Sequence, residues 1–504
     1  MAGLHPRVRA VLDLSIPTAR ELAGRHEYDG VVQDLSPQGI AAGVSGLGGQ
    51  PLPDAHDEAH LAAFEERARL ELGTLQLHRS NPLPHLDNLD LACYDRPYAR
   101  EAERADARRR RLAGWPDAID ASLQSLDAVP SPVARSLVAA ARGLAAGLVA
   151  DRSDDEARAV AAHRRLVAHL TTAADEGPPD FALGGTALAL LLGVPEATTV
   201  DLAELADQAE AEVRRLTALL AAAVEQISPG RPVDGVVAEL LTDHPDADGV
   251  VSEARALTEE VIAFTRTSGL APVDDGVCVV DVAPESRRWG VAMLGWAAPG
   301  EPEGPSFYHV TPPEPDWPAD QREEWLSMFN RTTLPAITVH EVAPGHFTHG
   351  RAMRQVTGDV RRHLMSDAFG EGWAHYVEEV CVDEGFRDHD PRFAAGVALE
   401  ALIRAVRLIC SIGMHTGVMD VDEATARFQR DALLGHAGAR SEAQRGTFDP
   451  RYGQYTWGKL ELVRLDARAR HLWGPTYSRR RFHDALLALG SPPLGLLDEA
   501  LRRG

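Results

Sequence analysis

Residues 340–349 read HEVAPGHFTH, a stretch that begins like the zinc motif His-Glu-x-x-His but places the second histidine two positions late. On a regular α-helix, residues six apart are separated by about 240° and about 9 Å of rise, so His340 and His346 would not reach one ion. Between them, Pro344 cannot donate to the helix ladder and Gly345 is conformationally free. We therefore predict that the backbone leaves the helix here and re-aims the second imidazole. An unbroken helix over this stretch would exclude a metal site.

Charge and composition limit the classes of partner. The 504 residues carry 51 Lys and Arg against 75 Asp and Glu, a net charge of −24. Nucleic acids and anionic membranes select basic surfaces, so we expect neither as a partner. The four cysteines are far apart and form no Cys-x-x-Cys pair, which is typical of reduced thiols. No N-terminal stretch has the apolar length of a signal peptide, and no run is long enough to span a bilayer. We expect a cytoplasmic protein.

The spacing of apolar residues predicts a mainly α-helical chain. Apolar side chains recur at three- and four-residue steps before residue 270 and again after about residue 318. Between them, short β-branched or aromatic runs predict a small antiparallel sheet. These runs lie at 276–282, 291–297 and 306–311. With neither a fixed-period repeat nor a Gly/Ser linker, we expect one domain over residues 1–504. Its parts would be a helical N-terminal half (1–270), a sheet (275–311) and a metal-binding helical half (318–504).

A third metal ligand is expected downstream, because a catalytic zinc site uses three protein ligands and leaves one position for water. The helix-like stretch SDAFGEGWAHYVEEV (366–380) places four ionisable side chains on one face, namely Asp367, Glu371, His375 and Glu378. Glycines on both sides of Glu371 would weaken a helix kept for stability alone, which favours a functional role. We predict Glu371 as the third ligand, oriented by Asp367 or His375. The alternative is a solvated acidic helix face.

Further candidates lie in the C-terminal third. Arg404 and Arg407 follow one stripe of a helix-like stretch, and burying two arginines costs free energy unless they meet carboxylates. Pairing with acids such as Glu378 or Glu379, and contact with a substrate, are the two open roles. Candidate donors to the oxyanion formed when water attacks a carbonyl are His415, Tyr452 and Tyr455. Lys459 is a candidate for holding a substrate carboxylate together with the arginines.

Four motifs occur in the order HEVAPGH, FGEGWAHYVEE, RAVRLICSIGMHTGVMDVDEATARF and YGQYTWGKLELVRLDAR. Together they resemble the bacterial domain of unknown function 885 family, which is similar to helical gluzincin metallopeptidases. The resemblance implies a large helical zincin-like architecture with the small sheet near the active-site cleft. It also implies Zn²⁺ held by His340, His346 and Glu371, with Glu341 as the general base.

Two positions are read through the same resemblance. Family members often carry Gln or another polar residue three positions after the second histidine, where this chain has His349. A place beside the ligands, an alternative ligand, a substrate contact and a plain helix-face histidine are its open roles. In SFYHVT, Tyr308 would contact the substrate from an edge strand beside the cleft.

The expected function is zinc-dependent hydrolysis of amide bonds in peptides or small peptide-like metabolites. One alternative is a metal-dependent biosynthetic enzyme on the same scaffold, such as a lyase, an isomerase or a metabolite-specific hydrolase. Another is a non-catalytic helical scaffold. The oligomeric state stays open.

Overall fold

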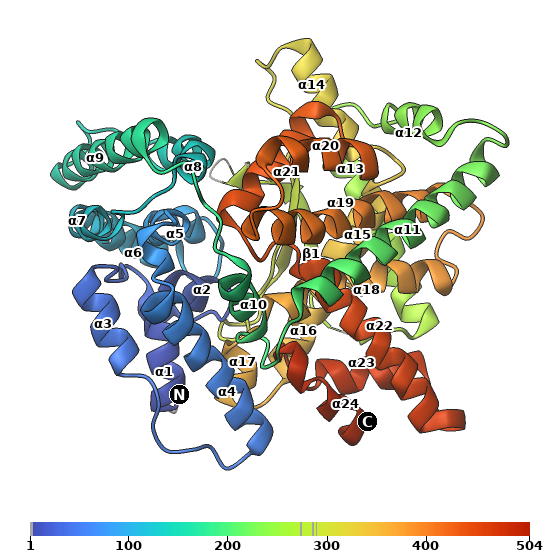
Figure 1. Cartoon of the computed structure of the whole chain (residues 1–504), viewed down its shortest axis with the longest axis horizontal. Helices are drawn as coiled ribbons and strands as arrows, with labels where there is room; N and C mark the ends of the chain where they lie inside the picture. The colour runs from blue at the N-terminus through green and yellow to red at the C-terminus, as the bar shows by residue number, and fades with distance from the viewer. Residues whose placement is uncertain (1–3, 273–274, 285–286, 289) are drawn as a thin grey trace.

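The protein is described by a computed structural model that covers residues 4–272, 275–284, 287–288 and 290–504 (Figure 1). It is mainly helical with one small sheet, as predicted. The N-terminal helices are α1 (Pro6–Asp13), α2 (Ile16–Glu21), α3 (Pro37–Ser45), α4 (Ala55–Ala68), α5 (Leu83–Leu89), α6 (Glu101–Ala113), α7 (Trp115–Ser125), α8 (Ser131–Gly143), α9 (Asp154–Glu176), α10 (Gly185–Gly193), α11 (Leu202–Ile227), α12 (Val233–Leu241) and α13 (Gly249–Ser268). No helix in the described ranges is long and apolar enough to cross a membrane.

The sheet and the C-terminal helices follow. The strands are β1 (Cys278–Val282), β2 (Ala292–Gly295) and β3 (Ser306–Val310). The helices are α14 (Ala319–Leu326), α15 (Leu334–Glu341), α16 (His346–Gln355), α17 (Asp359–His363), α18 (Asp367–Asp383), α19 (Arg392–His415), α20 (Val421–Asp431), α21 (His436–Phe448), α22 (Gln454–Trp473), α23 (Arg479–Leu487) and α24 (Asp498–Arg503).

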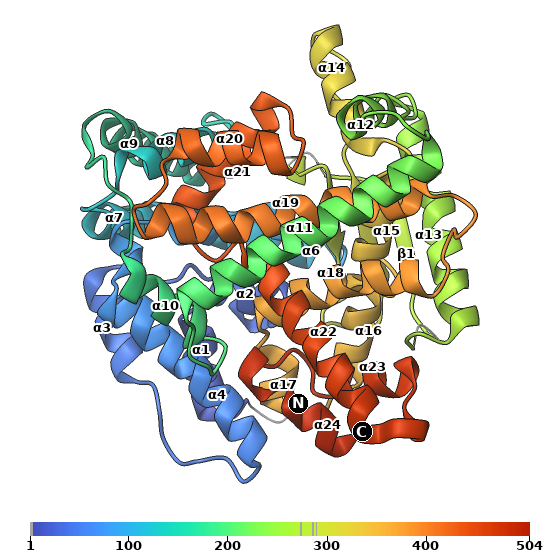
Figure 2. The ribbon, with the colours of Figure 1, turned by 45° about the vertical axis from the view of Figure 1, so that its right-hand side comes forward.

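The largest hydrophobic core joins α11, α13, the sheet and most of the C-terminal helices. Helices α11 and α19 lie side by side along much of their length (Figure 2). Helix α11 is capped at its N-terminus by Asp201, whose side chain accepts hydrogen bonds from the first-turn N–H groups of Ala203 and Glu204. Its apolar stripe, which includes Leu216 and Leu220, is buried in this core. A second core lies among α5–α9, around Trp115 and Leu166.

The sheet has the strand order β1-β3-β2, and it is mixed rather than antiparallel. Strand β3 pairs parallel with β1, where Val280 lies opposite Tyr308, and antiparallel with β2, where Leu294 lies opposite Tyr308. The prediction of an antiparallel sheet was therefore wrong, and so was the placing of SFYHVT at an edge. Four of the five β3 residues are buried, as suits a central strand, whereas alternation of side chains alone does not identify a strand's partner.

Candidate metal centre

The helix break predicted between the two histidines is confirmed. Helix α15 ends at Glu341 and α16 begins at His346. Between them, Val342 has φ −108° and ψ −93°, Gly345 has φ −72° and ψ −135°, and the Ala343–Pro344 peptide bond is cis. The chain turns out of one helix and into the next, so the two histidines no longer obey the spacing of a single helix.

The break needs glycine at position 345 and is tied to a neighbouring helix. A Cβ atom on Gly345 would lie 1.9 Å from the carbonyl oxygen of His340 and 2.4 Å from that of Val339, far inside contact distance. On the other side, the Trp373 indole in α18 donates a hydrogen bond of 2.9 Å to the Pro344 carbonyl. The turn is therefore held against the helix that carries the third candidate ligand.

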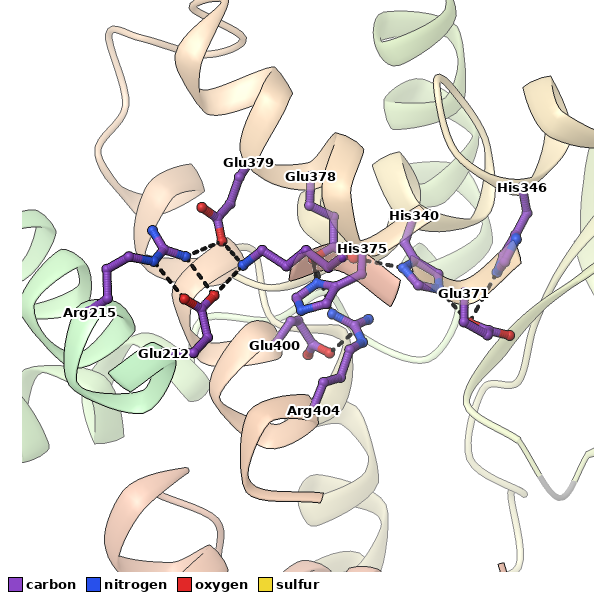
Figure 3. Close-up of polar contacts among 11 residues, drawn as sticks. Glu212, Arg215, His340, His346, Glu371, His375, Glu378, Glu379, Glu400 and Arg404 are labelled. Atoms are coloured by element: carbon purple, nitrogen blue, oxygen red, sulfur yellow. Dashed lines mark hydrogen bonds and ion pairs between the residues drawn. The ribbon is translucent and has the colours of Figure 1, made fainter. Parts of the chain in front are cut away.

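The structure brings His340, His346 and Glu371 together. One ligand atom from each lies within 4.8 Å of the other two. The Nε2 atoms of both histidines are 3.4 Å from Glu371 Oε2, and the two rings are nearly perpendicular with centroids 4.7 Å apart. Figure 3 shows both imidazoles directed toward the glutamate. The two-residue delay in the motif thus yields convergence, because the break moves His346 back toward His340.

This donor set fits zinc. Two imidazole nitrogens and one carboxylate oxygen are ligands that zinc prefers, and three protein ligands leave a position for water. Water reaches the site, since the side chains of His346 and Glu371 keep 19% and 27% of their exposure. Glu341 is half-buried, and among the described residues its carboxylate has no hydrogen-bond or ion-pair partner. It therefore has the freedom that a proton acceptor needs.

Neighbouring charges shift the pKa values of His340 and Glu371. Burial and the Arg404 charge lower the pKa of His340, but hydrogen bonds to Glu371 and Glu378 outweigh them and raise it to about 9. Burial opposes ionisation of Glu371, yet the two histidines hold the pKa of its carboxyl well below the ordinary value.

Tyr455, on α22, lies near the candidate ligand Glu371. Burial and the charge of Glu371 raise the pKa of the Tyr455 phenol to about 12, so it stays protonated at neutral pH.

The backbones of helices α18 and α22 are in direct contact. A Cβ atom on Gly458 would lie only 2.0 Å from the Ala368 carbonyl oxygen. Gly372 faces Gly458 at this crossing, which gives one of the glycines beside Glu371 a packing role.

Three other predicted residues are buried in packing contacts, and their predicted roles toward substrate or oxyanion stay predictions. Tyr308 is fully buried on the central strand β3, with its hydroxyl 3.4 Å from Thr338 Oγ1 in α15. Burial and the charge of nearby Glu341 raise the pKa of its phenol. His415 lies about 16 Å along α19 from Arg404, and its Nε2 donates to the Gly446 carbonyl at 2.9 Å. Tyr452 is buried against Gly446 as well. Periodicity placed them on helix or strand faces, but those faces point into the core.

The candidates for holding a substrate carboxylate are already paired. Arg407 forms two hydrogen bonds of 2.7 Å with Glu442 and lies over the Tyr455 ring. Arg404 binds Glu378 at 3.1 Å, which is the alternative of carboxylate pairing. Lys459 is almost fully buried between Glu212 and Glu379. These cations meet the acids that burial requires, so the structure does not leave them for substrate.

In the described ranges, no hydrogen bond joins Asp367, His375 or His349 to Glu371. Asp367 is half-buried, and its carboxylate lies 3.8 Å from the Arg67 guanidinium. His375 is buried 3.8 Å from Glu378, and burial lowers its pKa to about 4. His349 packs edge-on between Trp296 and Phe369, and burial lowers its pKa to about 3. Of its open roles, a buried helix-face histidine fits these contacts.

Sequence reasoning missed the contact between His340 and Glu378. The Nδ1 of His340 lies 2.6 Å from Glu378 Oε1, and the Glu378 side chain is wholly buried. The signal was present, because Glu378 follows Glu371 by seven residues and therefore lies on the same face of α18. The sequence pattern predicts Glu378 only as a possible salt-bridge partner of a buried arginine.

Comparisons with known proteins agree on the fold. The family model described as "Bacterial protein of unknown function (DUF885)" matches residues 17–501. A "putative lipoprotein of unknown function" from Shewanella oneidensis has a similar structure, with a TM-score of 0.79, 19% identity and 100% of both chains covered. A "putative lipoprotein" from Colwellia psychrerythraea also has a TM-score of 0.79, with 14% identity, 99% of this chain and 97% of the other covered. No curated protein matches the sequence.

Proposed function

Since this chain belongs to the DUF885 family of bacterial proteins of unknown function, we propose its activity from its own residues. We propose a zinc-dependent hydrolase of amide bonds in peptides or small peptide-like metabolites, on a gluzincin-like helical architecture. One observation carries the proposal, namely the convergence of His340, His346 and Glu371 within 4.8 Å next to Glu341.

The chemistry follows from the ligand set and its neighbours. Zinc held by these three residues would act as a Lewis acid that polarises the amide carbonyl and lowers the pKa of water. Glu341 would take a proton from the attacking water and deliver it to the leaving nitrogen. The Tyr455 phenol, which stays protonated, would donate a hydrogen bond to the carbonyl oxygen as it gains negative charge. Water is thus divided between the two products as the C–N bond breaks.

The proposal is tested by metal content and peptide cleavage together. We expect about one zinc per chain and cleavage of members of a short-peptide library. Glu341→Gln should keep the zinc and lose about 10²–10⁴-fold in rate, whereas His346→Ala should lose the zinc. Glu259→Gln and His436→Ala, both at exposed positions, are the matched controls. Purified protein without stoichiometric zinc, or an unchanged rate in both site variants, would show that this function is wrong.

A further inference from the structure

Behind His340, on the side away from the other two ligands, lies a chain of buried charges (Figure 3). Its first member is Glu378, a residue on α18 with no exposed side-chain surface. Glu378 Oε1 is 2.6 Å from His340 Nδ1, and Glu378 Oε2 is 3.1 Å from an Arg404 nitrogen. Arg404 in turn lies 3.7 Å from Glu400. Glu378 Oε2 also lies 3.8 Å from His375 Nδ1 on α18. The nearest partners of the two Glu378 oxygens therefore differ, and they come from two other helices, α15 and α19.

The contact with Glu378 determines which nitrogen of the His340 ring carries the hydrogen and how the ring is oriented. A carboxylate only accepts hydrogen bonds, so the hydrogen in this contact is on Nδ1. In the neutral ring, the lone pair is then on Nε2, the atom that lies 3.4 Å from Glu371. The ring is also fixed in rotation, because Nδ1 is held at 2.6 Å on one side and Nε2 faces the other candidate ligands.

Arg404 holds Glu378 in place, as Glu378 holds His340. A wholly buried carboxylate without a cation would be strongly disfavoured, and Arg404 supplies that cation from α19. It binds the oxygen that His340 does not use, so the two contacts do not compete. Glu400, one turn earlier on α19, stays with the arginine and helps to hold its side chain in place.

We infer that Glu378 and Arg404 are positioning residues for the metal ligand His340, although neither belongs to the ligand set. Glu378 fixes the orientation and the tautomer of the imidazole, and Arg404 fixes Glu378. This inference rests on the proposed function, since it concerns the affinity of the site for its metal. Partners of this kind typically change metal affinity 10–100-fold.

The next residue on the same helix offers a matched control. Glu379 points to the other side of α18, where it pairs with Lys459 and with Arg215 at 2.7 Å. Glu212 from α11 completes that cluster and also binds both cations. Both glutamates therefore neutralise cations in the interior, but within the described part of the chain no hydrogen bond or ion pair joins the Glu379 cluster to a candidate ligand. A variant at 379 disturbs a buried ion pair without touching His340.

The test compares zinc affinity, measured by competition with a chromophoric chelator, in three full-length proteins. We expect Glu378→Gln to bind zinc about 10–100-fold more weakly than wild type and Glu379→Gln to bind like wild type. The absorption spectrum of the cobalt-substituted protein should change in the first variant only, since it reports the ligand geometry directly. Equal zinc affinity in wild type and Glu378→Gln would overturn the inference while leaving the hydrolase proposal intact. An equal loss in both variants would also overturn it, because the effect would then be general destabilisation.

A double variant tests whether misfolding explains the loss, because Glu378→Gln alone leaves Arg404 buried without its main partner. The double variant Glu378→Gln with Arg404→Met removes both charges and relieves this defect. We expect the free energy of unfolding of the double variant to be closer to that of wild type than that of Glu378→Gln is. It should still bind zinc about 10–100-fold more weakly than wild type. Recovery of wild-type zinc affinity along with stability would overturn the inference. Wild-type protein that binds no zinc would overturn both this inference and the proposed function.

Discussion

Replacing Gly345 with alanine tests the geometry on which the candidate site depends. The added Cβ would lie 1.9 Å from the His340 carbonyl oxygen, whereas such contacts are essentially never shorter than 3.0 Å. The difference, 3.0 minus 1.9, is 1.1 Å of movement that the main chain must absorb. That movement falls on the carbonyl of a candidate ligand, so we expect Gly345→Ala to weaken both the fold and zinc binding.

The magnitude follows from two opposing effects. Overpacking of this kind typically costs about 1–3 kcal/mol, and the upper end applies because both atoms approached are backbone oxygens. Alanine also reduces the freedom of the unfolded chain, which returns about 0.4–1 kcal/mol. We therefore expect a net loss of about 2 kcal/mol in the free energy of unfolding, or roughly 30-fold in the folding equilibrium.

The assay is urea unfolding followed by circular dichroism, together with a zinc titration. Gly370→Ala is the matched control, since the nearest atom to its Cβ is His349 Cε1 at an ordinary 3.9 Å. This change within α18 should raise stability by about 0.5–1 kcal/mol. If Gly345→Ala unfolds at the same urea concentration as wild type and binds zinc equally well, the reasoning about the break is refuted.

Two further predictions concern Tyr455 and His483. Tyr455→Phe should lower kcat about 10²–10³-fold with zinc binding unchanged, while Tyr452→Phe, at a tyrosine buried against Gly446, should leave kcat unaltered. Equal kcat in wild type and Tyr455→Phe would remove the phenol from the mechanism. Burial lowers the pKa of His483 to about 4 from 6.5, so its contribution to stability is present above about pH 6.5 and is lost as the pH falls toward 4. The loss is about 3 kcal/mol, and urea unfolding between pH 7 and pH 4.5 should show a shallower decline for His483→Gln than for wild type.

The candidate ligands could be predicted because their signals are local. Proline and glycine between His340 and His346 act on the backbone within one turn, so a departure from helix follows from their covalent structure. Glu371 stood out because an acid between two glycines is unusual within a helix. The mainly helical character also follows from spacing that each helix carries in its own residues.

The errors concern contacts between segments far apart in the chain. Alternation identifies β3 as a strand but not its two neighbours, so the prediction placed Tyr308 on an edge strand rather than on the buried central strand. Helical periodicity put His415 on the stripe of Arg404 without showing that α21 covers that end of α19. Lys459 meets Glu212 from 247 residues away, a pairing that no local pattern specifies.

The hydrogen bond from Trp373 to the Pro344 carbonyl has a consequence for how the centre is lost. Trp373 lies two residues after Glu371 on α18, and its ring packs against His483 on α23. The turn that aims one histidine is therefore tied directly to the helix that supplies the carboxylate. We therefore expect His346 and Glu371 to be released together when this part of the chain opens, rather than one at a time.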